Sequence, residues 1–170
     1  YEKLMNLMRH REDQLDPEGP LTYHILLVKL LGNLCRGRNH LNKLKVGAIL
    51  PLDDILRVLK NTHTFHVVKR PFVYVLQHCY IDCFPFMTEE SALGMVPLMH
   101  EYCGVLQAVM SHDPKIRNRY TDPGRDLSSD GTEELQAYAF ETCIPLIMVF
   151  FQRCPKKALP AGELSVSLAK

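Results

Sequence analysis

Apolar residues recur at helical spacing along most of this chain, and this periodicity constrains its fold more than any other feature. Two quartets show it most clearly, because each occupies positions i, i+3, i+4 and i+7 on one face of an α-helix. They are Leu27, Leu30, Leu31 and Leu34, and then Leu52, Ile55, Leu56 and Leu59. No convincing pair of strands accompanies them. The pattern therefore predicts an all-α protein of about six helices.

Residues typical of helix starts and stops divide the chain into segments. Helices are expected over 1–14, from about 21 to the Gly37 stop, over 41–49, 52–61, 67–83 and 88–110, and from 133 to about 153. Pro51 and Asp53 should fix the start of the fourth of these, because a carboxylate in the first turn suits the positive end of the helix dipole. Turn residues fill 112–131. These residues predict a long, mobile loop. Thr132 is then expected to cap the last helix.

The helices have wide apolar faces and short connections, which is typical of chains that pack helix on helix. Residues 1–170 are therefore expected to form one domain, either an armadillo-like α-solenoid or an irregular helical bundle. Leu27, Leu30, Leu31 and Leu34 should form the seam of the first helix pair, and the second quartet should pack beneath them. The run 144–151 is apolar all round and is expected to be deeply buried.

Composition excludes several classes of protein. Hydrophobic residues make up 46% and charged residues 23%, so a disordered chain is not expected. The net charge of +1 provides no field to recruit nucleic acid or an anionic membrane. The longest apolar run has eight residues, against about 20 for a membrane span. Six scattered cysteines, mostly in apolar helical patterns, fit buried thiols of a reducing cytosol.

No motif for catalysis, a cofactor or a metal is present. Cys79, Cys83 and His78 lie together in sequence, and His100 precedes Cys103 by three residues, but no CxxC pair or HExxH supports a zinc site. The chain also lacks a Gly-rich phosphate loop and an EF-hand loop. We therefore expect no enzyme, no cofactor and no metal. The alternative in this class is a small helical enzyme that uses Cys79 or Cys103 with a histidine.

A basic cluster precedes and enters the third helix, with members Arg36, Arg38, His40, Lys43 and Lys45. Such groups suit phosphate when a turn frees backbone amides. A solvated turn between helices is the favoured explanation, and we assign them no ligand.

Three blocks in order carry a family resemblance. The stretch 50–55, LPLDDI, resembles the homology domain shared by inositol trisphosphate and ryanodine receptors. Upstream, the leucine-rich helix from Tyr23 closes in Cys-Arg-Gly-Arg-Asn at 35–39, similar to the family's Gly-Lys-Asn turn. Downstream, 76–82 reads LQHCYID, similar to a His-Cys-Tyr-Val-Asp pattern of inositol trisphosphate receptors. The resemblance covers about 21–83 and thins beyond it, although 135–154 loosely resembles the ryanodine receptor.

The resemblance implies a non-catalytic, armadillo-like scaffold in the cytosolic part of a tetrameric calcium-release channel of the endoplasmic or sarcoplasmic reticulum. Such a segment would transmit movement between a ligand-binding region and the pore. Its partners would be neighbouring domains and other subunits, with no small-molecule ligand, no nucleic acid and no membrane insertion of its own. The alternative is a free-standing helical adaptor that binds other proteins.

Overall fold

The computed structural model describes Leu4 and residues 18–37, 39–82, 87–111, 113–122 and 129–154, with the side chains of 129 and 130 excepted. Every regular element among these residues is helical, which confirms the all-α prediction. The elements are α2 (Pro20–Cys35), α3 (His40–Ile49), α4 (Leu52–Lys60), α5 (His66–Val75), η2 (Leu76–Ile81), α6 (Glu89–Met110), α7 (Pro114–Tyr120), α8 (Ser129–Tyr138), η3 (Ala139–Cys143) and α9 (Ile144–Arg153). Here η2 and η3 are π-helical turns that continue α5 and α8. The predicted helix over 1–14 lies outside the described residues, apart from Leu4.

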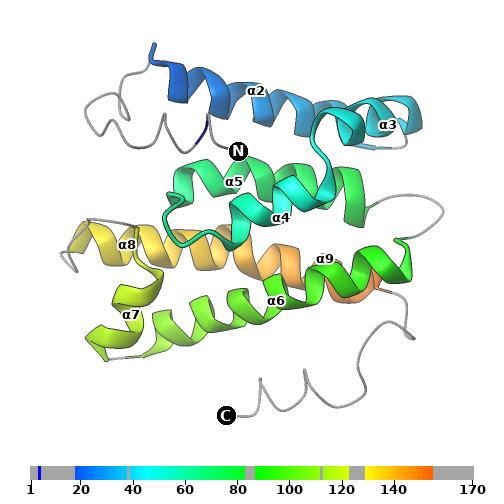
Figure 1. The fold of residues 1–170 in the computed structure, drawn as a ribbon. Helices are drawn as coiled ribbons and strands as arrows, with labels where there is room; N and C mark the ends of the chain where they lie inside the picture. Colours follow the sequence, from blue (N-terminus) through cyan, green and yellow to red (C-terminus); the bar gives the residue numbers. More distant parts are fainter. Residues whose placement is uncertain are drawn as a thin grey trace.

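The helices are stacked in layers (Figure 1). Helix α2 lies along one edge and packs on α5, with α3 following at its C-terminal end. Helix α4 packs on α5 and α6, and the long helix α8–η3–α9 lies between the α5 layer and α6. Short α7 turns across the end of α6. The armadillo-like solenoid stays a prediction.

Local chemistry places the helix ends where the sequence predicts several of them. Thr88 caps α6, since its side chain accepts a hydrogen bond from the Ser91 N–H at 3.2 Å. Pro51 directly precedes α4, and its carbonyl accepts from the Asp54 and Ile55 N–H groups. Gly37 follows α2 with a φ of 81°, the left-handed conformation that glycine adopts freely.

The second quartet is buried as expected. Ile55, Leu56 and Leu59 lie in the core, and Leu52 is half-buried against it. Asp53 lies in the first turn of α4, as predicted. The layer that this quartet meets is formed by α5 and α6, so the expectation that it packs directly beneath the first quartet is wrong.

The first quartet faces the other way. Leu27, Leu30 and Leu34 are 39%, 54% and 44% exposed, and Leu31 is only half-buried. The predicted seam is therefore wrong. Helix α2 buries Leu21, Val28, Gly32 and Cys35 instead. Gly32 explains the choice of face, because a Cβ there would lie 2.6 Å from Cδ1 of Tyr74 on α5. Small side chains let α2 and α5 approach closely, and bulky leucines at those positions would hold them apart.

Two expectations for the second half of the chain are also wrong. The predicted loop 112–131 contains helix α7, and α8 begins at Ser129, so Thr132 lies inside a helix and does not cap it. Residues 112 and 123–128 lie outside the described residues. In the apolar run 144–151, Leu146 and Phe150 are fully buried, while Met148 is 56% exposed. Ile147, Val149 and Phe151 are half-buried against the core, so the run is only partly buried.

One described helix, Gly131–Arg153, is long and apolar enough to cross a membrane by length and composition alone. About a third of its most apolar stretch (33%) is buried inside the protein. Its middle carries exposed Glu141, whose Oε2 lies 3.4 Å from Nη1 of Arg70 on α5. A carboxylate is costly at the centre of a bilayer. The expectation that this chain inserts no helix into a membrane stays a prediction.

Candidate functional site

A polar hollow lies where the start of α5 meets α6, α7 and α8. It is small, with room for little more than a water molecule (about 20 Å³), and it is partly open to solvent. Its lining combines both signs of charge with hydroxyl and aromatic groups: Thr62, Thr64, His66, Lys69, Glu101, Tyr102, Val105, Arg119, Tyr120, Thr121, Asp122 and Tyr138. Buried polar groups are rare in a protein of this size unless they have partners. The hollow is therefore the first place to look for a binding or catalytic site.

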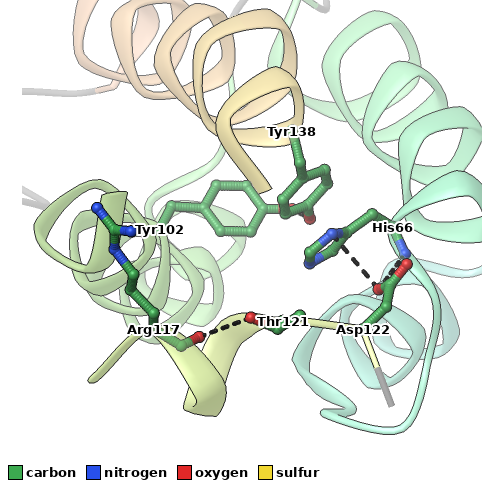
Figure 2. A network of polar contacts seen from close by, with 6 residues as sticks. All are labelled: His66, Tyr102, Arg117, Thr121, Asp122 and Tyr138. Carbon is green, nitrogen blue, oxygen red and sulfur yellow. Dashed lines mark hydrogen bonds and ion pairs between the residues drawn. The ribbon is translucent and has the colours of Figure 1, made fainter. Parts of the chain in front are cut away.

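Asp122 and His66 form the centre of this cluster (Figure 2). The Asp122 Oδ1 atom accepts a hydrogen bond from the backbone N–H of His66 at 2.8 Å and lies 3.4 Å from ring atom Nδ1. Both side chains are almost fully buried. Helix α5 begins at His66, and its N-cap residue Phe65 makes no side-chain cap. Asp122 thus satisfies an N–H at the start of α5 from a distant part of the chain.

Two tyrosines extend the cluster into the core. The His66 ring stacks on Tyr138, with ring centroids 4.2 Å apart and planes 8° from parallel. The Tyr138 hydroxyl donates to the Tyr102 hydroxyl at 3.2 Å. Burial raises the pKa of both phenols well above the ordinary value, so both stay neutral. Side chains from α5, α6 and α8 therefore meet in one network.

Helix α7 and the turn after it hold Asp122 in place. Arg117 Nε donates to the Ser111 carbonyl at 2.7 Å, and Thr121 Oγ1 donates to the Arg117 carbonyl at 2.9 Å. Tyr120 lies against Gly104 of α6, where an added Cβ would be 2.9 Å from Cζ of the ring and closer still to its hydroxyl. Glycine at 104 thus allows the Tyr120 ring, at the end of α7, to lie directly against α6.

Lys69 and Glu101 face the hollow from α5 and α6. Burial lowers the pKa of the Lys69 ammonium, and the negative charges of Glu101 and Asp122 partly oppose this shift. Burial likewise raises the pKa of Glu101, partly opposed by Lys69. Desolvation thus outweighs attraction for both groups, which is the usual cost of placing charges inside a protein. The two shifts are consistent, because each group is moved toward its neutral form.

This arrangement is suited to joining helices. The oxygen of Asp122 nearest to α5 is used in capping, the phenols are neutral, and opposite charges face one another across the hollow. No described residue there is a thiol or serine that a neighbouring base could activate. The cluster gathers the ends of α5 and α7 against α6 and α8, and a packed joint of this kind resists relative movement of its parts.

Thiol chemistry is disfavoured elsewhere in the described part. Cys35, Cys79, Cys103, Cys143 and Cys154 carry buried thiols. Burial raises the pKa of four of them, namely Cys35, Cys103, Cys143 and Cys154. A raised pKa depletes the thiolate, which is the reactive form. Cys83 lies outside the described residues.

The candidate metal-binding side chains do not converge. Within the described ranges no three His, Cys, Asp or Glu side chains come close enough together to hold a metal ion. His78, adjacent in sequence to Cys79, instead sets its ring edge-on to Tyr74, with centroids 4.4 Å apart.

The basic cluster is divided by the structure. Arg36, His40 and Lys45 are exposed, whereas Lys43 is buried and its Nζ donates to the Asp82 carbonyl at the end of η2. Arg38 lies outside the described residues. Asp82 in turn pairs with Arg153, whose Nη2 lies 2.9 Å from Oδ1. Lys43 is thus a tie between α3, η2 and the end of α9, and no ligand is assigned to it.

Sequence reasoning missed the residues of the hollow. His66 and Asp122 are 56 positions apart, and no local motif joins them. One signal was available: no Ser, Thr, Asp or Asn stands immediately before α5, so its first N–H groups needed a partner from elsewhere.

Comparison with known proteins places the chain beside a much longer receptor. No protein-family model matches the chain. It is 35% identical, over 170 residues and 98% of its length, to the inositol 1,4,5-trisphosphate receptor itr-1 of Caenorhabditis elegans. The chain spans about 5% of the length of that receptor.

Proposed function

We propose that this chain is a non-catalytic helical segment of the cytosolic part of an intracellular ligand-gated calcium-release channel. The observation that carries the proposal is the extent of the similarity, which runs through 98% of this chain but occupies 5% of a receptor. The ordered blocks over 21–83 agree with it. The channel would be a homotetramer in the endoplasmic or sarcoplasmic reticulum membrane, and this segment would contact its neighbouring domains and subunits.

The role we infer is mechanical. A segment that transmits movement between a ligand-binding region and a pore must shift as a body. The cluster around Asp122 and His66 supports such a role, because it joins four helices through buried polar contacts as well as through apolar packing. The raised thiol pKa values argue against catalysis by a cysteine.

A free-standing adaptor is the second candidate. The exposed leucines of α2 favour it, since an apolar helix face in contact with water is a common mark of a protein interface. The same face is also compatible with a channel segment that meets a neighbouring domain. The two candidates therefore differ in whether this chain is part of a much longer polypeptide.

Fractionation of source cells tests directly whether this chain is part of a much longer polypeptide. An antibody to residues 113–122 should detect a polypeptide many times heavier than 19.5 kDa that stays with reticulum membranes after alkaline extraction. A soluble band near 19.5 kDa would reject the channel segment and favour the adaptor. A heavy soluble band would reject the membrane channel as well.

Transmission calls for a second experiment, on the parent channel. Asp122→Ala should weaken ligand-evoked calcium release while leaving ligand binding and protein level unchanged, because the joint is loosened and the binding region is untouched. Asp113→Ala is the matched control, since Asp113 caps the exposed helix α7 through the Lys115 N–H at 2.8 Å. Equal release from both variants and the unmodified channel would contradict the mechanical role.

A further inference from the structure

The outer face of α2 carries an apolar stripe that nothing in the described part of the chain covers. Leu26, which is 56% exposed, borders a row formed by Tyr23, Leu27, Leu30 and Leu34, which are 68%, 39%, 54% and 44% exposed. Their spacing, i, i+4, i+7 and i+11, keeps them on one side of an α-helix. The residues that α2 buries against α5 lie on the opposite side. Figure 1 shows α2 at the edge of the layered stack, with α5 on its inner side.

Helix α3 adds to this surface. Leu41 and Leu44 are 70% and 72% exposed, and Ile49 is 63% exposed. The Asn42 side chain donates to the Leu34 carbonyl at 3.2 Å and so ties the start of α3 to the end of α2. We call the exposed apolar side chains of α2 and α3 together the α2–α3 face. Scattered exposed leucines are ordinary, but an aligned stripe is typical of an interaction site.

Charge narrows the choice of partner. The sequence contains no Asp or Glu between Glu18 and Asp53. Its basic residues in that interval include exposed Lys29, Arg36, His40 and Lys45. Three of these four follow or border the end of α2. A partner would therefore find apolar contacts along α2 and positive charge at one end.

We propose that the α2–α3 face binds an amphipathic helix, supplied from outside residues 1–170, whose apolar stripe is flanked by Glu and Asp. The row on α2 has the spacing of a coiled-coil seam and, with Leu26 beside it, fits the a and d positions of one partner helix. Acidic flanks would complement the basic end, whereas a second copy of this face would bring like charges together. This proposal rests on the α2–α3 face alone and does not depend on the channel assignment.

A membrane surface suits the α2–α3 face less well. A helix that lies in a membrane interface has a strongly charged polar side. Lys29 is the only formally charged residue of α2. The polar side of α2 also carries Asn33, which is uncharged. The electrostatic part of membrane binding would thus be weak along this helix.

The test uses two synthetic peptides of three heptads, alike in leucine at a and d but carrying Glu in one and Lys in the other at e and g. Fluorescence anisotropy with the 170-residue chain should show salt-sensitive binding of the Glu peptide and at least about tenfold weaker binding of the Lys peptide. Absence of Glu-peptide binding, or equal binding of both peptides, would overturn the proposal.

Variants locate the binding. Leu30→Glu should weaken Glu-peptide binding about tenfold or more, because it places a carboxylate inside the stripe. Leu93→Glu is the matched control, since Leu93 on α6 is also 54% exposed. The double variant Arg36→Glu with Lys45→Glu should reverse the preference between the peptides. Circular dichroism confirms that each variant is folded. An equal effect of Leu30→Glu and Leu93→Glu would overturn the location.

Two further measurements test the alternative occupants of the α2–α3 face, namely a second copy of this chain and a membrane surface. Sedimentation of the chain alone should give a monomer, and a dimer that Leu30→Glu abolishes would assign the face to a second copy instead. Vesicles of phosphatidylcholine with phosphatidylserine should not carry the chain down. Vesicle binding that Leu30→Glu abolishes would replace the helix partner with a membrane and overturn the proposal.

Discussion

The Asp122 carboxylate caps a helix that begins 56 residues earlier in the chain, through a 2.8 Å hydrogen bond from the His66 backbone N–H. Helix caps usually come from the residue just before the helix. Here Phe65 occupies that place and makes no side-chain cap, so a turn after α7 provides the acceptor. The contact couples the position of α7 to the start of α5.

Asp122→Ala should lower the free energy of unfolding by about 1–2 kcal/mol, the usual range for losing a helix cap. Asp122→Asn should recover most of that loss, because its amide oxygen can still accept from His66. Urea denaturation of the three proteins measures the difference. Asp113→Ala, on an exposed cap of a short helix, should cost less. Equal losses from Asp113→Ala and Asp122→Ala would show that the long-range cap adds nothing.

Two glycines of α6 should respond oppositely to the same substitution. Gly94→Ala should raise stability by about 0.5–1 kcal/mol, since its Cβ would meet only Leu56 Cδ1 at 4.0 Å. Gly104→Ala should lower stability by about 1 kcal/mol or more, because its Cβ collides with Tyr120 and pushes α7 away. Thermal unfolding of both variants provides the comparison. In a Tyr120→Ala background the Gly104→Ala penalty should disappear, and its persistence there would contradict the clash.

Leucines on opposite sides of α2 should differ in cost. Leu21→Ala removes a side chain that is 2% exposed and should destabilise the fold by about 2–5 kcal/mol. Leu30→Ala removes one that is 54% exposed and should change stability by less than about 0.5 kcal/mol. Equilibrium denaturation of the isolated chain distinguishes the two. A large loss for Leu30→Ala would restore the seam that the sequence alone suggested.

The contribution of Glu101 to the free energy of unfolding should fall as pH rises. Its folded pKa is raised above the ordinary value of 4.5 by burial, so the folded state holds the proton more tightly than the unfolded state. This contribution is complete below about pH 4.5 and is lost as pH rises through the folded pKa. The free energy of unfolding of the unmodified chain relative to Glu101→Gln should therefore decrease from pH 4.5 to pH 7.

Buried thiols should react slowly in the native state. Cys103 and Cys143 have pKa values raised by burial, so little thiolate forms at neutral pH. Alkylation followed by peptide mass spectrometry should modify both only at the rate at which the protein opens, and quickly in denaturant. Fast native labelling of Cys79 or Cys103 would revive the enzyme alternative and contradict the non-catalytic proposal.

Helix positions were predictable because they depend on neighbours in sequence. Thr88 and the acidic residues after it mark the start of α6, and Pro51 marks the start of α4, without help from the rest of the fold. The missed helix α7 had the same kind of signal. Asp113 caps it and Pro114 is its first residue, but the surrounding turn residues outweighed these two marks.

Which face a helix buries was less predictable. Helix α2 is apolar on two sides, and the choice between them depended on the fit of Gly32 beneath Tyr74 on another helix. The polar hollow was out of reach for a similar reason. His66, Asp122 and Tyr138 come from three segments, and only tertiary packing brings them together.

The π-helical turns Leu76–Ile81 and Ala139–Cys143 have a consequence for how this chain compares with its relatives. A π-turn holds about one residue more than an α-turn, so the residues after it are out of phase by about 100° with an uninterrupted helix. Deleting one residue there would straighten the helix and turn its downstream part to another side. A relative without the π-turn should therefore align with a one-residue gap in the middle of a helix, where a gap would otherwise signal a misalignment.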